Sequence, residues 1–325
     1  MIYFTSSWDD GAVTDLKLAE LLVKHNQQAT FYIPLANLEN RKVIRPDQML
    51  DLSDQFEIGA HTMNHKYLTT IPDKEAIYEI TESKKALEEI ISGPVEGFCF
   101  PGGKYRKRHI QFVKDAGFKY ARTVNQFKYR QLDTLMNTTL QAYNHSAFTH
   151  LKHLLKRGYF TEIFQNFRYI TRQRHWDKLL LNIIHDKMND RSGRDYFIHL
   201  WGHSWEVEEH DTWDQLDHFF EGLSSLGIKS IANNEMINLT SVLNTISSPN
   251  DISSPNTISS PNTISSPNAI SSPNTISSPN NISSPNDISS PNDTSPRNGV
   301  SSPDAISSPE QQGGVKKQAP GKKIE

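Results

Sequence analysis

The sequence has 325 residues, a formal net charge of -3 and a single cysteine, Cys99. This charge excludes a broad basic field that would concentrate nucleic acid or anionic membrane, so we expect neither partner. One cysteine excludes an intrachain disulfide framework and fits a reducing compartment. Residues 1–8 lack the basic and apolar stretches of a leader, and no later run approaches the roughly 18 apolar residues that span a membrane. We therefore expect a cytoplasmic protein, unless a leader precedes this sequence.

Strand and helix patterns alternate over the first part of the chain. Residues 15–25 and 73–91 carry apolar side chains at helical spacing, whereas residues 56–60 form a short apolar run that stops directly before His61. The expected strands are 2–6, 29–34, 56–60, 97–100 and 120–124, and the expected helices are 15–25, 46–54, 73–91 and 105–116. This alternation predicts an α/β fold with a mostly parallel sheet or barrel, whose chemistry sits at the carboxyl ends of the strands.

Residues 127–190 interrupt this alternation. They are rich in aromatic and basic residues, the segments 148–158 and 176–187 have helical patterns, and no strand pattern is evident. We interpret this stretch as a helical insertion. The alternation then resumes with a strand at 196–201, an amphipathic helix at 212–226 and a last strand at 229–232.

The end of the chain repeats with a period of six. From Ile246 to Pro309 the unit reads Ile-Ser-Ser-Pro-Asn followed by a variable residue. Proline in every unit blocks helix, and one isolated isoleucine buries too little apolar area to offset the ordering entropy. We therefore predict a catalytic domain at residues 1–243 and a disordered low-complexity tail at 244–325.

Three polar clusters follow predicted strands. Asp9 and Asp10 follow the first strand, His61 and His65 follow the third, and Pro101 with two glycines follows the fourth. Two histidines four apart can reach one ion, and a carboxylate from another loop completes a set of three ligands with open positions. An adjacent carboxylate can then accept a proton from a water. This pattern predicts a catalytic metal site.

With these motifs the sequence resembles the polysaccharide deacetylase family, carbohydrate esterase family 4, over roughly residues 2–240. The first family motif stands here as Trp8-Asp9-Asp10-Gly11, and the second as His61-Thr62-Met63-Asn64-His65. The resemblance implies a distorted (β/α) barrel and one divalent metal ion. Zinc is the expected ion, and cobalt, manganese and nickel are the alternatives. It also implies Asp9 as general base and Asp10, His61 and His65 as metal ligands.

The third family motif differs in this sequence. The family places an arginine two residues before the proline, where it orients the catalytic aspartate, but this chain has Cys99-Phe100-Pro101. Arg122, at the end of the next predicted strand, is our candidate replacement. Backbone amides near Tyr105 are expected to help hold the oxyanion.

The last family motif is a histidine that follows an apolar strand and protonates the leaving amine. His185, His199 and His203 are the candidates, and we favour His203 because Gly202 permits a close turn at the end of the strand. His185 lies in a helical pattern, and His199 lies inside the strand. Trp201 and Trp205, on either side of His203, could stack on a sugar face or pack in the core.

The resemblance implies a metal-dependent hydrolase that removes N-acetyl or O-acetyl groups from a sugar or polysaccharide. Two alternatives stay open: a hydrolase of small amides or imides with the same site, and an inactive carbohydrate-binding protein. The missing motif arginine and the repetitive tail motivate the second alternative. The sequence does not indicate the oligomeric state.

Overall fold

The structure is a computed structural model that describes residues 1–130 and 134–246, with side chains described to residue 240. The chain divides into two units, Met1–Pro255 and Asn256–Glu325, and the second lies outside the described residues. The predicted tail also lies outside them, except where helix α10 (Asn233–Ile246) runs past residue 243. The domain boundary and the disorder of the repeat therefore stay predictions.

A 9-stranded sheet forms the centre of this unit, and all of its strand pairs are parallel. The strand order is β6-β5-β4-β3-β2-β1-β8-β7, with β9 also paired to β1. The strands are β1 (Ile2–Asp9), β2 (Thr30–Ile33), β3 (Glu57–Ala60), β4 (Gly97–Cys99), β5 (Tyr120–Arg122), β6 (Leu135–Met136), β7 (Leu140–Gln141), β8 (Tyr196–Gly202) and β9 (Lys229–Ser230).

The first strand is the centre of the sheet. It pairs with β2, β8 and β9, and every residue of β1 after Ile2 is buried. Two of its polar side chains form hydrogen bonds with neighbouring elements. The Thr5 hydroxyl donates to Asn233 Oδ1 at 2.7 Å, and Ser7 Oγ lies 2.8 Å from His199 Nε2. A parallel strand covered on both faces is expected to be buried along its length.

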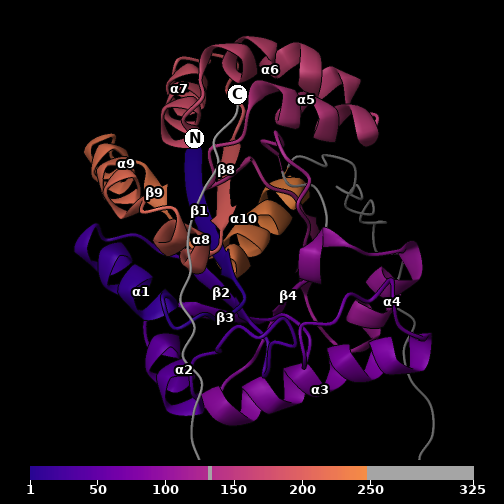
Figure 1. Cartoon of the computed structure of the whole chain (residues 1–325). Coiled ribbons are helices and arrows are strands. Elements are labelled where there is room, and N and C mark those ends of the chain that lie inside the picture. Colours follow the sequence, from indigo (N-terminus) through magenta and orange to yellow (C-terminus); the bar gives the residue numbers. More distant parts are fainter. Residues whose placement is uncertain (131–133, 247–325) are drawn as a thin grey trace, which may run out of the picture. The chain divides into compact units, whose positions relative to one another are not determined.

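Helices cover the sheet and carry the chain between its strands. Figure 1 shows α1 to α4 around β1 to β4, and α5, α6 and α7 gathered together at the top of the view. The helices are α1 (Asp15–Lys24), α2 (Pro46–Ser53), α3 (Asp73–Ile91), α4 (Lys107–Asp115), α5 (Ala147–Lys156), α6 (Phe160–Arg172), α7 (Trp176–Met188), α8 (Ser204–Glu209), α9 (Trp213–Ser225) and α10, with a 3-10 turn at Pro101–Gly103.

The predicted α/β fold with a parallel barrel-like sheet is confirmed, and most predicted elements lie within a few residues of their observed bounds. The first strand is longer than predicted and runs to Asp9. Within residues 127–190, where no strand was expected, the pairs at 135–136 and 140–141 add to the two sheet edges. Strands of two residues carry no period-2 pattern, so only their partners define them.

One half-buried carboxyl joins three strands of the sheet and helix α10. Glu57, at the start of β3, accepts hydrogen bonds from Thr30 Oγ1 at 2.6 Å, the Tyr120 hydroxyl at 2.8 Å and the Asn234 amide at 3.0 Å. Burial raises the pKa of Glu57 from 4.5 to about 7, although these hydrogen bonds act in the opposite direction. The folded protein therefore holds a proton here that the unfolded chain releases.

This proton makes the stability dependent on pH. Because the pKa of Glu57 is higher in the folded protein, the free energy of unfolding should fall as the pH rises from 4.5 through 7. We expect Glu57 to contribute about 2 kcal/mol of this loss. Urea unfolding at several pH values should show the loss in wild type and its reduction in Glu57→Gln. The exposed control Glu89→Gln should keep the wild-type dependence of unfolding free energy on pH. A wild-type dependence in Glu57→Gln would contradict a raised pKa for Glu57.

Candidate active site

Three predicted metal ligands converge at the carboxyl ends of the strands. Asp10 follows β1, and His61 and His65 follow β3. Asp10 Oδ1 lies 3.0 Å from His65 Nε2 and 3.5 Å from His61 Nε2, and all three side chains are buried. Asp10, Thr62 and His65 have φ values of 80°, 65° and 57°, a region that non-glycine residues rarely adopt. Such backbone conformations are typical of functional sites.

The chemistry of these groups fits a divalent cation. Asp10 Oδ1 is buried and accepts no hydrogen bond within the described part of the chain. Burial alone would raise the pKa of Asp10, but the imidazoles of His61 and His65 hold it well below its usual range. His61 Nδ1 donates to the Cys99 carbonyl at 2.9 Å, which leaves Nε2 as the free nitrogen. Two imidazoles and one carboxylate are a common ligand set of catalytic zinc.

The neighbouring carboxylate, Asp9, is held by different partners. Arg122 Nη2 donates to Asp9 Oδ1, and Cys99 Sγ lies 3.7 Å from Asp9 Oδ2. Arg122 and Cys99 are fully buried and are register partners on β5 and β4. The Arg122 side chain therefore reaches Asp9 from β5, and its partner across the strands at position 99 is a small cysteine.

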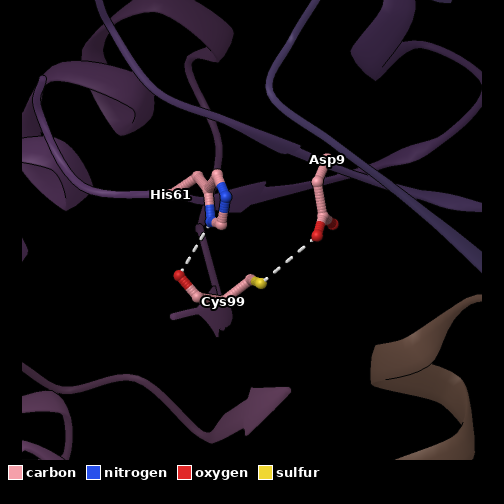
Figure 2. A group of neighbouring side chains, drawn as sticks. All are labelled: Asp9, His61 and Cys99. Carbon is pink, nitrogen blue, oxygen red and sulfur yellow. Dashed lines mark hydrogen bonds between the residues drawn. The ribbon is translucent and has the colours of Figure 1, made fainter. Parts of the chain in front are cut away.

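A second group of possible ligands overlaps the first. Asp9, His61 and Cys99 also bring ligand atoms within 4.8 Å of one another. Figure 2 shows that the Cys99 thiol points to Asp9, whereas His61 turns its Nδ1 to the Cys99 carbonyl. Burial raises the pKa of the Cys99 thiol well above its usual value, which disfavours the thiolate that binds metals. Because Asp9 is already paired with Arg122, the set containing Asp10 is the better metal site.

Of the three candidate histidines, only His203 faces this centre. His203 follows β8, its Nδ1 donates to Glu206 Oε2 at 2.8 Å, and its Nε2 lies 4.0 Å from Asp10 Oδ2. Burial alone would lower the pKa of His203, but Glu206, Asp10 and Asp9 raise it to about 9. His199 is buried within β8 against Ser7, and His185 is exposed on α7.

The remaining predicted residues take different positions. Trp205 Nε1 donates to Asp10 Oδ2 at 2.9 Å, so Trp205 orients one of the predicted metal ligands. The guanidinium of Arg41 lies 3.2 Å from the centre of the Trp205 ring and covers one face of that ring. Trp201 is buried but lines a cavity beside Asp9. Tyr105 stacks on Phe100 at 4.4 Å, directly after the turn that forms part of the cavity wall.

A cavity of about 580 Å³ opens beside Asp9 and His203. One wall is the turn at 102–104, and another comes from α5 and the residue after it, with His153, Leu154, Lys156 and Arg157. The sequence did not predict this wall, because no motif links a helix of the insertion to the site. It also missed Glu206, although an acid three residues after His203 is a usable signal for an orienting partner.

Comparison with known proteins agrees with this geometry. Residues 2–121 match the family model "Polysaccharide deacetylase", and this segment contains Asp9, Asp10, His61 and His65. Over this segment, the chain is similar to the polysaccharide deacetylase family. A peptidoglycan-N-acetylglucosamine deacetylase of Bacillus cereus is 27% identical over 103 residues, which cover 32% of this chain and 46% of that protein. The match thus spans less than half of that relative.

The fold extends beyond the matched segment. A solved structure from Mycobacterium smegmatis, described as a polysaccharide deacetylase, aligns with a TM-score of 0.52 at 13% identity, covering 80% of this chain and 94% of that one. At this identity the similarity establishes the fold, which is the predicted distorted (β/α) barrel. Arg122 and His203 lie outside the family match, and their assignment depends on the geometry of this structure.

The buried Arg122–Asp9 pair should couple energetically. Arg122→Met leaves a buried carboxylate without its cation, so we expect a loss of about 3 to 5 kcal/mol in unfolding free energy. The double variant Asp9→Asn/Arg122→Met should lose at least about 2 kcal/mol less than the sum of the two single losses. Urea unfolding of all four proteins measures this coupling.

The exposed pair Arg41–Glu209, at 3.1 Å, offers a matched control, for which we expect coupling of about 1 kcal/mol or less. Additive losses at Arg122 and Asp9 would show that the two side chains do not form the pair.

Proposed function

We propose that the protein is a metal-dependent hydrolase that removes acetyl groups from an acetylated carbohydrate. The observation that supports this proposal is that two adjacent carboxylates have different partners. Asp10 faces two imidazoles, whereas Asp9 faces Arg122 at the edge of a cavity. A hydrolase that activates water needs both a cation site and a separate base beside it. The match of residues 2–121 to the polysaccharide deacetylase family model supports carbohydrate as the substrate class.

Asp10, His61 and His65 would hold the cation, which we propose to be zinc because of its ligand set. When bound, the cation supplies Lewis-acid chemistry, polarising the acetyl carbonyl and lowering the pKa of a water. Trp205 fixes the orientation of the Asp10 carboxylate through Oδ2 and leaves Oδ1 directed at the imidazoles. The Cys99 carbonyl fixes the ring of His61 in the same way.

Asp9 is the proposed base. Its carboxylate lines the cavity, and Arg122 holds it in place and keeps it from turning toward the cation site. It accepts a proton from the attacking water as the bond to the acetyl carbon forms. The turn at 102–104 lines the same cavity, but the Gly103 and Lys104 amides donate to carbonyls within the turn. We therefore propose the backbone amide of Tyr105, directly after the turn, as a donor to the developing oxyanion.

His203 is the proposed acid. It lines the cavity with Asp9, and Glu206 holds its Nδ1, so Nε2 is directed toward the centre. When the bond to the acetyl group breaks, His203 donates a proton to the departing sugar amine. The products are acetate and a free amino sugar. An O-acetyl sugar would react by the same steps and give acetate and a sugar with a free hydroxyl.

One experiment with three histidine variants tests these roles together. Wild type supplied with zinc should bind metal and release acetate from N-acetylated oligosaccharides. His65→Ala should lose both metal and turnover, because it lacks one of three ligands. His203→Ala should keep the metal while turnover falls by roughly 10² or more. Metal analysis and acetate assays give the two readouts.

His185→Ala is the matched control, because it removes an exposed histidine from α7 and should keep both properties. Turnover of small amides but of no acetylated sugar would favour an amide hydrolase. Sugar binding without turnover in wild type would favour the binding-protein alternative. Full metal retention by His65→Ala would rule out the proposed ligand set.

A further inference from the structure

The α5–α6 hairpin exposes an unusual amount of apolar surface. Every phenylalanine that is exposed within the described residues lies here: Phe148, Phe160, Phe164 and Phe167 are 75%, 66%, 87% and 53% exposed. Leu155, on α5, is 54% exposed. Such side chains gain about 1.5 to 3 kcal/mol each on full burial, so a contiguous patch of them marks an interaction surface.

The patch on α6 is contiguous. Phe160, Phe164 and Phe167 are spaced by four and three residues, so they share one face of the helix. Together with Ile163 and Arg168 they line a surface hollow of about 410 Å³. The opposite face, with Asn166 and Ile170, is buried. The helix therefore has one side fixed in the protein and an aromatic side without a partner in the described structure.

The hairpin is also strongly basic. Residues 147–174 contain six lysines and arginines and one acidic residue, Glu162, in a chain whose net charge is -3. Glu162 is paired with Lys128 at 2.5 Å. Within the described residues, Lys152, Lys156, Arg172 and Arg174 have no carboxylate within ion-pair distance. The low net charge of the whole chain conceals this local excess, and the expectation of no membrane partner depended on that net charge.

We propose that the α5–α6 hairpin docks the protein on the surface of an anionic lipid bilayer. Exposed aromatic side chains flanked by lysine and arginine suit the boundary between headgroups and acyl chains, where the rings enter and the cations meet the phosphates. A second copy of this chain suits the patch less well, because a two-fold contact would set the same basic residues against each other. No helix in the described residues is long and apolar enough to cross a membrane.

Docking has a consequence for the substrate, and this consequence rests on the proposed function. Helix α5 belongs to the hairpin and also forms a wall of the cavity beside Asp9 and His203, through Leu154, Lys156 and the following Arg157. Figure 1 shows α5 and α6 together at one end of the barrel. Docking would therefore bring the cavity close to the headgroups. The substrate class that this arrangement favours is an acetylated sugar presented at the membrane surface.

Vesicle flotation of the full chain tests docking without any assay of turnover. Wild type should float with vesicles of mixed phosphatidylglycerol and phosphatidylcholine, and at least about tenfold less with phosphatidylcholine alone. Phe164→Ser/Phe167→Ser should bind the anionic vesicles at least about tenfold more weakly, because it removes the two central rings. Lys152→Gln/Arg172→Gln/Arg174→Gln should show a similar loss that high salt reproduces in wild type.

Leu38→Ser/Tyr78→Ser is the matched control, since these side chains are 63% and 56% exposed outside the hairpin, and it should bind as wild type does. Absence of wild-type flotation, or equal flotation of Phe164→Ser/Phe167→Ser, would overturn the proposal. If wild type binds no vesicles but sediments as a dimer, and Phe164→Ser/Phe167→Ser sediments as a monomer, the patch is instead a contact between copies of this chain. Each of these outcomes leaves the deacetylase assay unaffected, so failure of docking and failure of the proposed function are distinguishable.

Discussion

The site depends on one backbone constraint at the end of β1, where two consecutive carboxylates must face different partners. Asp9 is the last residue of the strand and lies opposite Arg122, whereas Asp10 has a φ of 80° that turns its side chain toward His61 and His65. Aspartate tolerates this left-handed conformation better than most residues, but it still costs about 1 kcal/mol or more. The buried sheet around β1 stabilises a geometry that the local chain alone would not keep.

The parallel register then determines which residues can join this pair. Neighbouring strands end side by side, so Cys99 and Arg122 are partners across β4 and β5, and Trp8 is opposite Gly202 just before His203. At position 202 a Cβ atom would lie 3.0 Å from the Trp8 ring, so glycine lets β8 approach β1 closely there. The arginine that holds Asp9 therefore comes from β5, one strand beyond the cysteine at position 99.

The sequence predicted the alternating fold and the grouping of Asp10, His61 and His65 because each depends on a local pattern. Apolar runs marked the main strands, and His61 and His65 were found by their spacing. Arg122 was proposed only as a candidate, because its contact with Asp9 joins residues 113 positions apart. The two-residue strands β6 and β7, Glu206 and the α5 wall of the cavity were missed, since tertiary packing rather than local sequence places them.

The central claim, that adjacent carboxylates have separate tasks, is tested most directly by comparing Asp9→Asn with Asp10→Asn. Zinc affinity and acetate release are measured on both variants and on wild type. The account predicts that Asp9→Asn binds zinc as wild type does while turnover falls by roughly 10² to 10⁴, because only the base is neutralised. It predicts that Asp10→Asn loses zinc. Loss of zinc by Asp9→Asn with retention by Asp10→Asn would contradict it.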